Sequence, residues 1–240
     1  MILSAHQLNY LPYAGLLSKI NSSDKFLYLS KVQFEKKSWQ SRNRILSKNK
    51  DFLLSVPVIN KNVKQLIADV RINNKINWKK KHLKSIEINY SKTKYFNDYI
   101  NFFRTFYEKD WIYLAEMNEY FLKYIIQELQ IKTEILSDRD LNFKKKKNDF
   151  IIEICNHFKA NEYLSNKGSE KYIDLELFKK NKINHYFVDY HDTDYRNQTN
   201  LSVTNLSVID MLFHCGSKKT SKIIKDNRNL KFSKNYQFLK

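Results

Sequence analysis

A histidine and two carboxamides stand close together near the start of the chain, in His6-Gln7-Leu8-Asn9-Tyr10-Leu11-Pro12. An imidazole can act as a general acid or base near neutral pH, or it can donate a hydrogen bond to a phosphate. Gln7, Asn9 and Tyr10 can both donate and accept hydrogen bonds. We therefore take His6 as the candidate catalytic residue and the other three as candidate substrate-binding residues. The alternative is that His6 and Asn9 only tie down an irregular loop.

A second polar cluster lies about 30 residues further along the chain, and it combines amides, guanidinium groups and an aromatic ring. Its candidate binding residues are Gln33, Trp39, Arg42, Asn43 and Arg44. A guanidinium group can grip a phosphate or a carboxylate with two hydrogen bonds. Trp39 could stack on a base or a sugar, although aromatic residues at such spacing are more often part of a core. The cluster predicts an anion-binding surface, against the alternative of a solvated charged face.

A third basic cluster is Trp78-Lys79-Lys80-Lys81-His82, at the expected start of a helix. Backbone N–H groups at a helix N-terminus favour a phosphate. Lys81 and His82 are therefore further candidate binding residues. This cluster is a weaker candidate for an anion site than the cluster around Arg42 and Arg44, because a run of lysines is usually a solvated face.

Several common chemistries lack their sequence signatures. The chain has 3 glycines in total, so it contains neither a phosphate-binding P-loop nor a dinucleotide-binding glycine motif. Its 2 cysteines and 6 histidines show no zinc-ligand spacing, and no metal site is expected. No Gly-x-Ser-x-Gly nucleophile motif occurs. Catalysis, if it occurs, would depend on positioning and on acid-base groups.

The elements that must position these side chains follow from the apolar patterning. A short strand at residues 1–5 leads through a loop into a helix that begins near Pro12. Further strands are expected at residues 25–29, 53–58, 66–72, 133–136, 162–164 and 186–188. Helices are expected within residues 76–129, where the apolar period is 3.6, and at about 150–158, 169–180 and 206–213.

This alternation predicts an α/β fold with a mostly parallel sheet flanked by helices and a helical middle segment at about residues 76–130. We expect a single α/β domain over residues 1–216 and a basic, loosely packed tail over residues 217–240. In open α/β sheets ligands bind outside the carboxyl ends of the strands. The clusters around His6 and Arg42 follow the first two strands, so we expect them to face each other across one crevice.

The charge of the chain is strongly positive, with 43 Lys+Arg against 25 Asp+Glu and a formal net charge of +18. Such a surplus is typical of proteins that bind nucleic acid, anionic lipid or phosphorylated substrates, but lysine is also the default exposed residue. No stretch is apolar enough for a membrane-spanning helix, and the first residues lack the features of a secretory signal. The unpaired cysteines fit a reducing compartment, so we expect a cytoplasmic protein.

At these clusters the sequence resembles the WbqC-like family, whose members open with His-Gln-x-Asn-Tyr-Leu-Pro-aromatic-x-Gly. The resemblance continues through Ser38-Trp39-Gln40, Arg42-Asn43-Arg44-Ile45, Trp78-Lys79-Lys80-Lys81-His82, Tyr163-Leu164-Ser165 and Leu206-Ser207-Val208-Ile209-Asp210. It covers nearly the whole chain to Gly216, and it adds Ser165 and Asp210 to the candidate binding residues. The chain departs from the family pattern at Leu8 and around Arg196, where the family has prolines.

What the resemblance implies is a transferase of bacterial O-antigen and other surface-polysaccharide gene clusters. The implied reaction adds a glycyl or other acyl group to the amine of a nucleotide-linked amino sugar. Its partners would be that nucleotide-linked sugar and an activated donor, such as an aminoacyl-tRNA or another acyl donor; no cofactor beyond a nucleotide or such a donor is implied. The order of elements at the start of the chain is a strand, His6, a Pro-x-x-Gly turn and a helix. This order also resembles the loops that hold ATP phosphates in nucleotidyl-transferring α/β folds.

For the reaction we expect His6 to accept the proton of the attacking amine and Arg42 and Arg44 to neutralise a diphosphate. The first alternative is a basic RNA-binding module or a protein that uses aminoacyl-tRNA. The second is a non-catalytic scaffold of a glycan assembly complex. The sequence leaves the sugar, the transferred group and the oligomeric state open.

Overall fold

A six-stranded sheet forms the centre of the molecule in the computed structural model, which describes residues 1–48, 50–59, 64–196, 203–226 and 228–232. The strands are β1 (Ile2–Gln7), β2 (Lys25–Leu29), β7 (Glu134–Ser137), β8 (Glu162–Asn166), β9 (Asn184–Tyr190) and β10 (Arg228–Phe232). Their spatial order is β10-β9-β8-β1-β2-β7. All neighbouring strands pair in parallel except β10, which is antiparallel to β9. The predicted α/β fold with a mostly parallel sheet is confirmed.

The strand order reverses at β1, the central strand. The chain moves outward from β1 to β2 and β7, and it then returns to the other side of β1 to form β8 and β9. This is the topology in which ligands bind at the carboxyl edge, between the two strands where the direction changes. Here those strands are β1 and β8, which end at Gln7 and Asn166.

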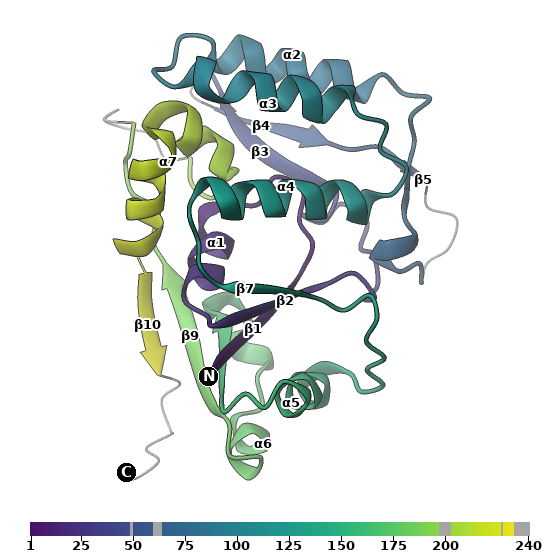
Figure 1. Cartoon of the computed structure of the whole chain (residues 1–240), viewed down its shortest axis with the longest axis vertical. Helices are drawn as coiled ribbons and strands as arrows, with labels where there is room; N and C mark the ends of the chain where they lie inside the picture. Colours follow the sequence, from purple (N-terminus) through teal and green to yellow (C-terminus); the bar gives the residue numbers. More distant parts are fainter. Residues whose placement is uncertain (49, 60–63, 197–202, 227, 233–240) are drawn as a thin grey trace.

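Helices cover both faces of the sheet. The larger core cluster joins α1 (Ala14–Asn21), α4 (Leu114–Glu128) and α7 (Val208–Asp226) to one face. The smaller cluster packs α5 (Lys147–His157) and α6 (Leu175–Lys180), which follows the 3-10 turn Lys167–Tyr172, against the other face. Figure 1 shows α5 and α6 at the bottom of the molecule, with α2 (Trp78–Tyr90) and α3 (Phe96–Glu108) at the top. The expected helical middle segment is therefore confirmed as α2, α3 and α4.

Two predicted strands differ from the structure, and one observed strand was not predicted. The first half of the segment at 53–58 lies in β4 (Lys50–Ser55), which pairs with β3 (Arg42–Ser47) in a separate hairpin. The segment at 66–72 is a 3-10 turn, Ile67–Asp69, followed by β6 (Arg71–Ile72), which pairs with β5 (Val58–Ile59) and not with the central sheet. Strand β3 was not predicted, because its two arginines interrupt the apolar pattern. The arginine segment is thus a strand and not a loop.

The last helix, α7, is longer than its apolar pattern suggests. It contains a kink at Gly216, whose φ of 70° and ψ of 167° are not helical. A Cβ atom at this position would lie 2.8 Å from the Tyr95 ring, so only glycine fits. Beyond the kink α7 continues to Asp226, with Thr220 and Ile224 buried. Residues 217–226 therefore differ from the expected loosely packed tail, and residues 233–240 lie outside the described part of the chain.

Candidate functional site

His6 lies at the carboxyl end of β1, beside the point where the strand order reverses. Its ring is half-buried, and its Nδ1 is 2.8 Å from the carbonyl oxygen of Gln7. Because a carbonyl oxygen can only accept, Nδ1 must carry the proton that is donated to it. In the neutral imidazole Nε2 therefore keeps its lone pair and can accept a hydrogen bond from a ligand.

The electrostatic surroundings keep His6 neutral. Burial lowers the pKa of His6 to about 3, and the positive charge of Lys19 contributes in the same direction. Lys19 on α1 is 2% exposed, and its Nζ donates to the carbonyl oxygen of Ala5 at 2.9 Å. Burial lowers the pKa of the Lys19 ammonium group to about 7. At neutral pH His6 is therefore a hydrogen-bond acceptor and only a weak base.

The turn after β1 contacts the arginine segment directly, whereas the sequence predicted that the two would face each other across a crevice. The N–H group of Tyr10 donates to the carbonyl oxygen of Trp39 at 3.0 Å, and Gln40 Nε2 donates to Gln7 Oε1 at 2.7 Å. Asn43 Nδ2 donates to the carbonyl oxygens of Tyr10 and Leu11, at 3.2 and 2.6 Å. The two clusters are thus neighbours at one edge of the sheet.

Trp39 and the two arginines form a partly exposed group on this edge. Trp39 is 45% exposed, and the guanidinium carbons of Arg42 and Arg44 lie 5.9 and 5.4 Å from its ring centroid. Arg44 also donates to Asp51 Oδ2 at 3.3 Å and to the carbonyl oxygen of Thr204 at 3.4 Å. No ion pair involves Arg42 within the described residues. Arg42 is therefore the better candidate for contacting an anion.

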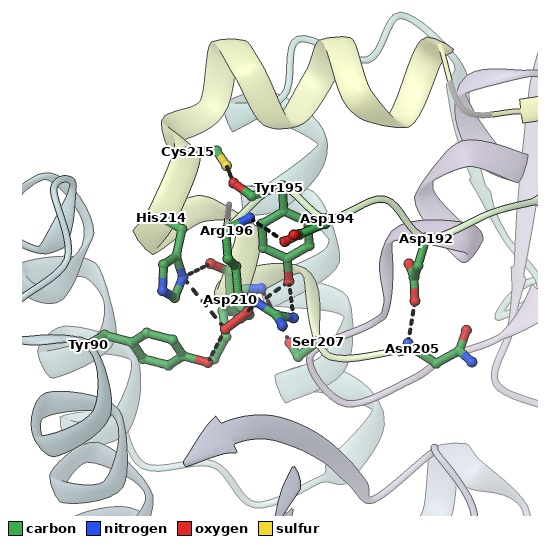
Figure 2. Close-up of polar contacts among 11 residues, drawn as sticks. Tyr90, Asp192, Asp194, Tyr195, Arg196, Asn205, Ser207, Asp210, His214 and Cys215 are labelled. Carbon is green, nitrogen blue, oxygen red and sulfur yellow. Dashed lines mark hydrogen bonds and ion pairs between the residues drawn. The ribbon is translucent and has the colours of Figure 1, made fainter. Parts of the chain in front are cut away.

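Asp210 on α7 is the centre of a buried polar cluster (Figure 2). Its side chain has 0% exposure, and Arg196 Nε donates to its Oδ2 at 2.9 Å. The hydroxyl groups of Tyr195 and Tyr90 donate to the same carboxylate at 2.7 and 3.2 Å. His214 Nδ1 donates to the Asp210 carbonyl oxygen at 2.8 Å. The cluster fastens the segment after β9 to α7.

A small pocket of about 90 Å³ lies beside this cluster. It is lined at one side by Ala14, the first residue of α1, and at the other by Asp192, Tyr195, Arg196 and Thr204. Arg44 reaches the same place through the carbonyl oxygen of Thr204. A volume of this size holds a few water molecules or one small group, and not a whole nucleotide-linked sugar.

Some of the predicted binding residues have internal partners. The Tyr10 hydroxyl is 2.8 Å from His82 Nδ1 and 2.6 Å from the Tyr107 hydroxyl, and all three side chains are buried. Buried Ser165 shares a hydrogen bond of 2.9 Å with His185 Nε2. Tyr10, Asn43, His82, Ser165 and Asp210 therefore make contacts that support the fold around the site.

Other predicted residues remain accessible. Lys81 and Gln33 are exposed, and the backbone of Gln33 pairs with Leu66. Asn9 is buried, and its Oδ1 has no hydrogen-bond partner within the part of the chain that the structure describes. Unlike Lys81 and Gln33, Asn9 is therefore not accessible to a ligand in this structure. Asn197 and Ser202, where the sequence departs from the family pattern, lie outside the described residues.

Comparisons with known proteins identify the family of the chain. The model of the WbqC-like protein family matches residues 7–222. The chain belongs to this family. A relative, "Uncharacterized protein Rv1507c" of Mycobacterium tuberculosis (strain ATCC 25618 / H37Rv), is 27% identical over 215 residues, which are 88% of this chain and 93% of that protein. No solved structure matches this WbqC-like chain. No helix among its described residues is long and apolar enough to cross a membrane.

Two functional candidates of this WbqC-like protein escaped the sequence analysis. Arg196 completes the Asp210 cluster, but it stands alone in a polar stretch with no motif around it. Lys19 lies in the apolar helix after the His6 turn and is one of 36 lysines, so composition alone does not mark it. The sequence signal that could have identified Lys19 is its place on the apolar side of a helix, between Leu16, Leu17 and Ile20.

The burial of His82 makes a prediction about acid stability. Burial lowers the pKa of His82 to about 4, below its ordinary value of 6.5. Between these values the unfolded chain binds the proton and the folded chain does not, so this contribution to stability is complete above pH 6.5 and is lost as the pH falls towards 4. This difference between the pKa values of the unfolded and folded chains corresponds to about 3 kcal/mol in the free energy of unfolding.

We expect urea unfolding at several pH values to show a smaller acid loss in His82→Gln than in the wild type. Replacement of the exposed His157 by glutamine is the matched control, and it should leave the pH dependence unchanged. Equal pH dependence in the wild type and in His82→Gln would contradict the neutral, buried state of this ring.

Proposed function

We propose that this WbqC-like protein is a transferase in surface-polysaccharide precursor biosynthesis. Its reaction would add a glycyl or other acyl group to the amine of a nucleotide-linked amino sugar. The amine nitrogen attacks the carbonyl carbon of an activated acyl or aminoacyl donor, and the bond from that carbon to the leaving group breaks. The proton of the amine passes to the leaving group or to water.

The observation that supports this proposal best is the contact between the His6 turn and the arginine segment. The hydrogen bonds between Gln7 and Gln40 and between Tyr10 and Trp39 hold the two segments together. One edge of the sheet therefore carries an imidazole acceptor, an exposed indole ring and two partly exposed guanidinium groups. A nucleotide-linked sugar offers groups that match each of these: an amine, a base and a diphosphate. The edge is also where α/β sheets of this topology bind ligands.

Within this proposal His6 Nε2 accepts a hydrogen bond from the amine and so directs the nitrogen lone pair at the donor carbonyl. A neutral imidazole suits this role, because a protonated ring would repel the attacking amine's N–H groups. Arg42 and Arg44 neutralise the diphosphate.

Calorimetry with a panel of nucleotide-linked sugars tests the proposal. We expect at least one of them to bind, and we expect Arg42→Ala to weaken that binding roughly 10-fold or more, since hydrogen bonds to charged groups are among the strongest. The matched control is Arg104→Ala, because Arg104 pairs with Glu87 on the distant helices α2 and α3. An absence of binding by all the sugars, or equal affinities of the two variants, would contradict the proposal.

A further inference from the structure

A second and larger pocket lies at the carboxyl ends of β2 and β7, in the loops that follow Leu29 and Ser137. Its volume is about 660 Å³, which is within the usual range of small-molecule sites. We call it the lysine pocket, because its lining includes Lys31, Lys64, Lys144, Lys145, Lys146 and Lys147. The loop that connects β7 to α5, and that carries Lys144, Lys145 and Lys146, can be followed in Figure 1.

Positive charge is in excess in the lysine pocket, whose lining has six lysines and one carboxylate. Among the residues that the structure describes, none of these six lysines forms an ion pair with a carboxylate. The one carboxylate in the lining, Asp138, is buried and accepts hydrogen bonds from the Ser30 N–H, the Ser30 hydroxyl and the Lys31 N–H, at 2.9, 2.6 and 2.8 Å. Its oxygens are therefore already used to hold the loop after β2.

The backbone that carries the lysines is held in place. Glu153 on α5 accepts hydrogen bonds from the N–H groups of Lys144 and Lys145, at 3.2 and 3.0 Å. Lys31 Nζ donates to the carbonyl oxygen of Leu141 at 2.9 Å, which joins the two loops across the pocket. A pocket wall that is ordered before binding lowers the entropy cost of binding a ligand.

The lysine pocket also has an apolar wall. Phe143 and Phe150 pack edge to face, with ring centroids 5.6 Å apart, and Leu141 lines the pocket beside them. The pocket thus offers cationic groups and a hydrocarbon surface in one concave site. A ligand that uses both needs a strongly anionic part joined to an apolar or planar part.

We infer that the lysine pocket binds a diphosphate ester. Two linked phosphates can contact several ammonium groups at once, and the organic part of the ester can lie on Phe143 and Phe150. A bounded pocket fits such a ligand better than it fits an RNA strand, which needs an open groove. This inference does not depend on the proposed transfer reaction or on the arginine segment. A nucleoside diphosphate and a prenyl diphosphate are the two sources of this chemistry.

Calorimetry tests this inference. The ligands are uridine diphosphate, geranyl diphosphate, inorganic pyrophosphate and a short single-stranded RNA, each measured at 2 or more salt concentrations because binding through phosphate contacts weakens as salt rises. The variant carries Lys144→Gln, Lys145→Gln and Lys146→Gln, all at exposed positions. The matched control carries Lys179→Gln, Lys180→Gln and Lys182→Gln, which remove the same charge from exposed positions at the end of α6. We expect the first variant to weaken diphosphate binding about 10-fold or more, and the control to change it less than about 2-fold.

A further variant, Phe143→Ala, should weaken binding of the preferred ester and leave pyrophosphate binding unchanged. Tighter binding of uridine diphosphate assigns the nucleotide source, and tighter binding of geranyl diphosphate assigns the lipid source; either result supports the inference. Binding of RNA alone, equal losses in the two lysine variants, or no diphosphate binding at low salt would overturn it. The three lysines changed in the first variant take no part in the proposed transfer reaction. Failure of this inference can therefore be told apart from failure of the proposed transferase function.

Discussion

Replacing Asp210 by alanine is expected to lower the free energy of unfolding by about 3–5 kcal/mol, because the change leaves a buried cation without its partner. The Arg196 side chain is 6% exposed and makes its ion pair with Asp210 at 2.9 Å. The hydroxyl groups of Tyr195 and Tyr90 lose their acceptor at the same time. Urea unfolding followed by tryptophan fluorescence and circular dichroism measures the loss.

Asp51→Ala is the matched control for this prediction. Asp51 also pairs with an arginine, but its side chain is 49% exposed and its partner Arg44 is 28% exposed. Exposed ion pairs contribute about 0–1 kcal/mol, so this variant should unfold almost like the wild type. The double variant Asp210→Ala, Arg196→Met should recover part of the stability, because it also removes the unpaired buried charge. If Asp210→Ala costs no more than Asp51→Ala, the Asp210 cluster is not a stabilising centre.

The parallel sheet could be predicted because its strands carry their own local signal. The predicted range 25–29 is the range observed for β2. The prediction succeeds because this short apolar run is bounded by polar residues, and its three central residues are buried in the sheet. Strand β3 gives no such signal. Arg42 and Arg44 alternate with buried Asn43 and Ile45, so one face of β3 is polar and the other carries an amide that bonds to the His6 turn. Such a strand cannot be recognised from apolar residues alone.

The position of the candidate site could be predicted more readily than the state of its residues. His6, Gln7 and the arginine segment lie together because the ends of neighbouring parallel strands share one edge. The low pKa of His6, in contrast, depends on burial and on Lys19, which only the packing of α1 brings near. The lysine pocket likewise joins loops that are over 100 residues apart, as the hydrogen bond from Lys31 to Leu141 shows. Contacts of that separation have no local sequence pattern.

Replacing His6 by alanine is expected to slow acyl transfer by about 10²-fold or more while leaving folding and sugar binding intact, because the attacking amine loses the acceptor that directs it. Since the pKa of His6 is lowered to about 3, the wild-type rate should show no titration of this ring between pH 5 and pH 8. Initial rates of the wild type and the variant against pH, with the nucleotide-linked sugar identified by calorimetry, measure both effects.

His6→Gln separates the two roles that His6 could have. A glutamine carbonyl oxygen can accept a hydrogen bond, but it cannot take up a proton near neutral pH. If His6 acts by accepting a hydrogen bond from the amine, His6→Gln should keep part of the activity that His6→Ala loses; if proton uptake is its task, the two variants should be equally slow. His157→Gln on α5 is the control, and it should turn over like the wild type. Turnover of His6→Ala within about 2-fold of the wild type would remove His6 from the mechanism, because an acid-base or positioning group at the reacting atom contributes far more than that.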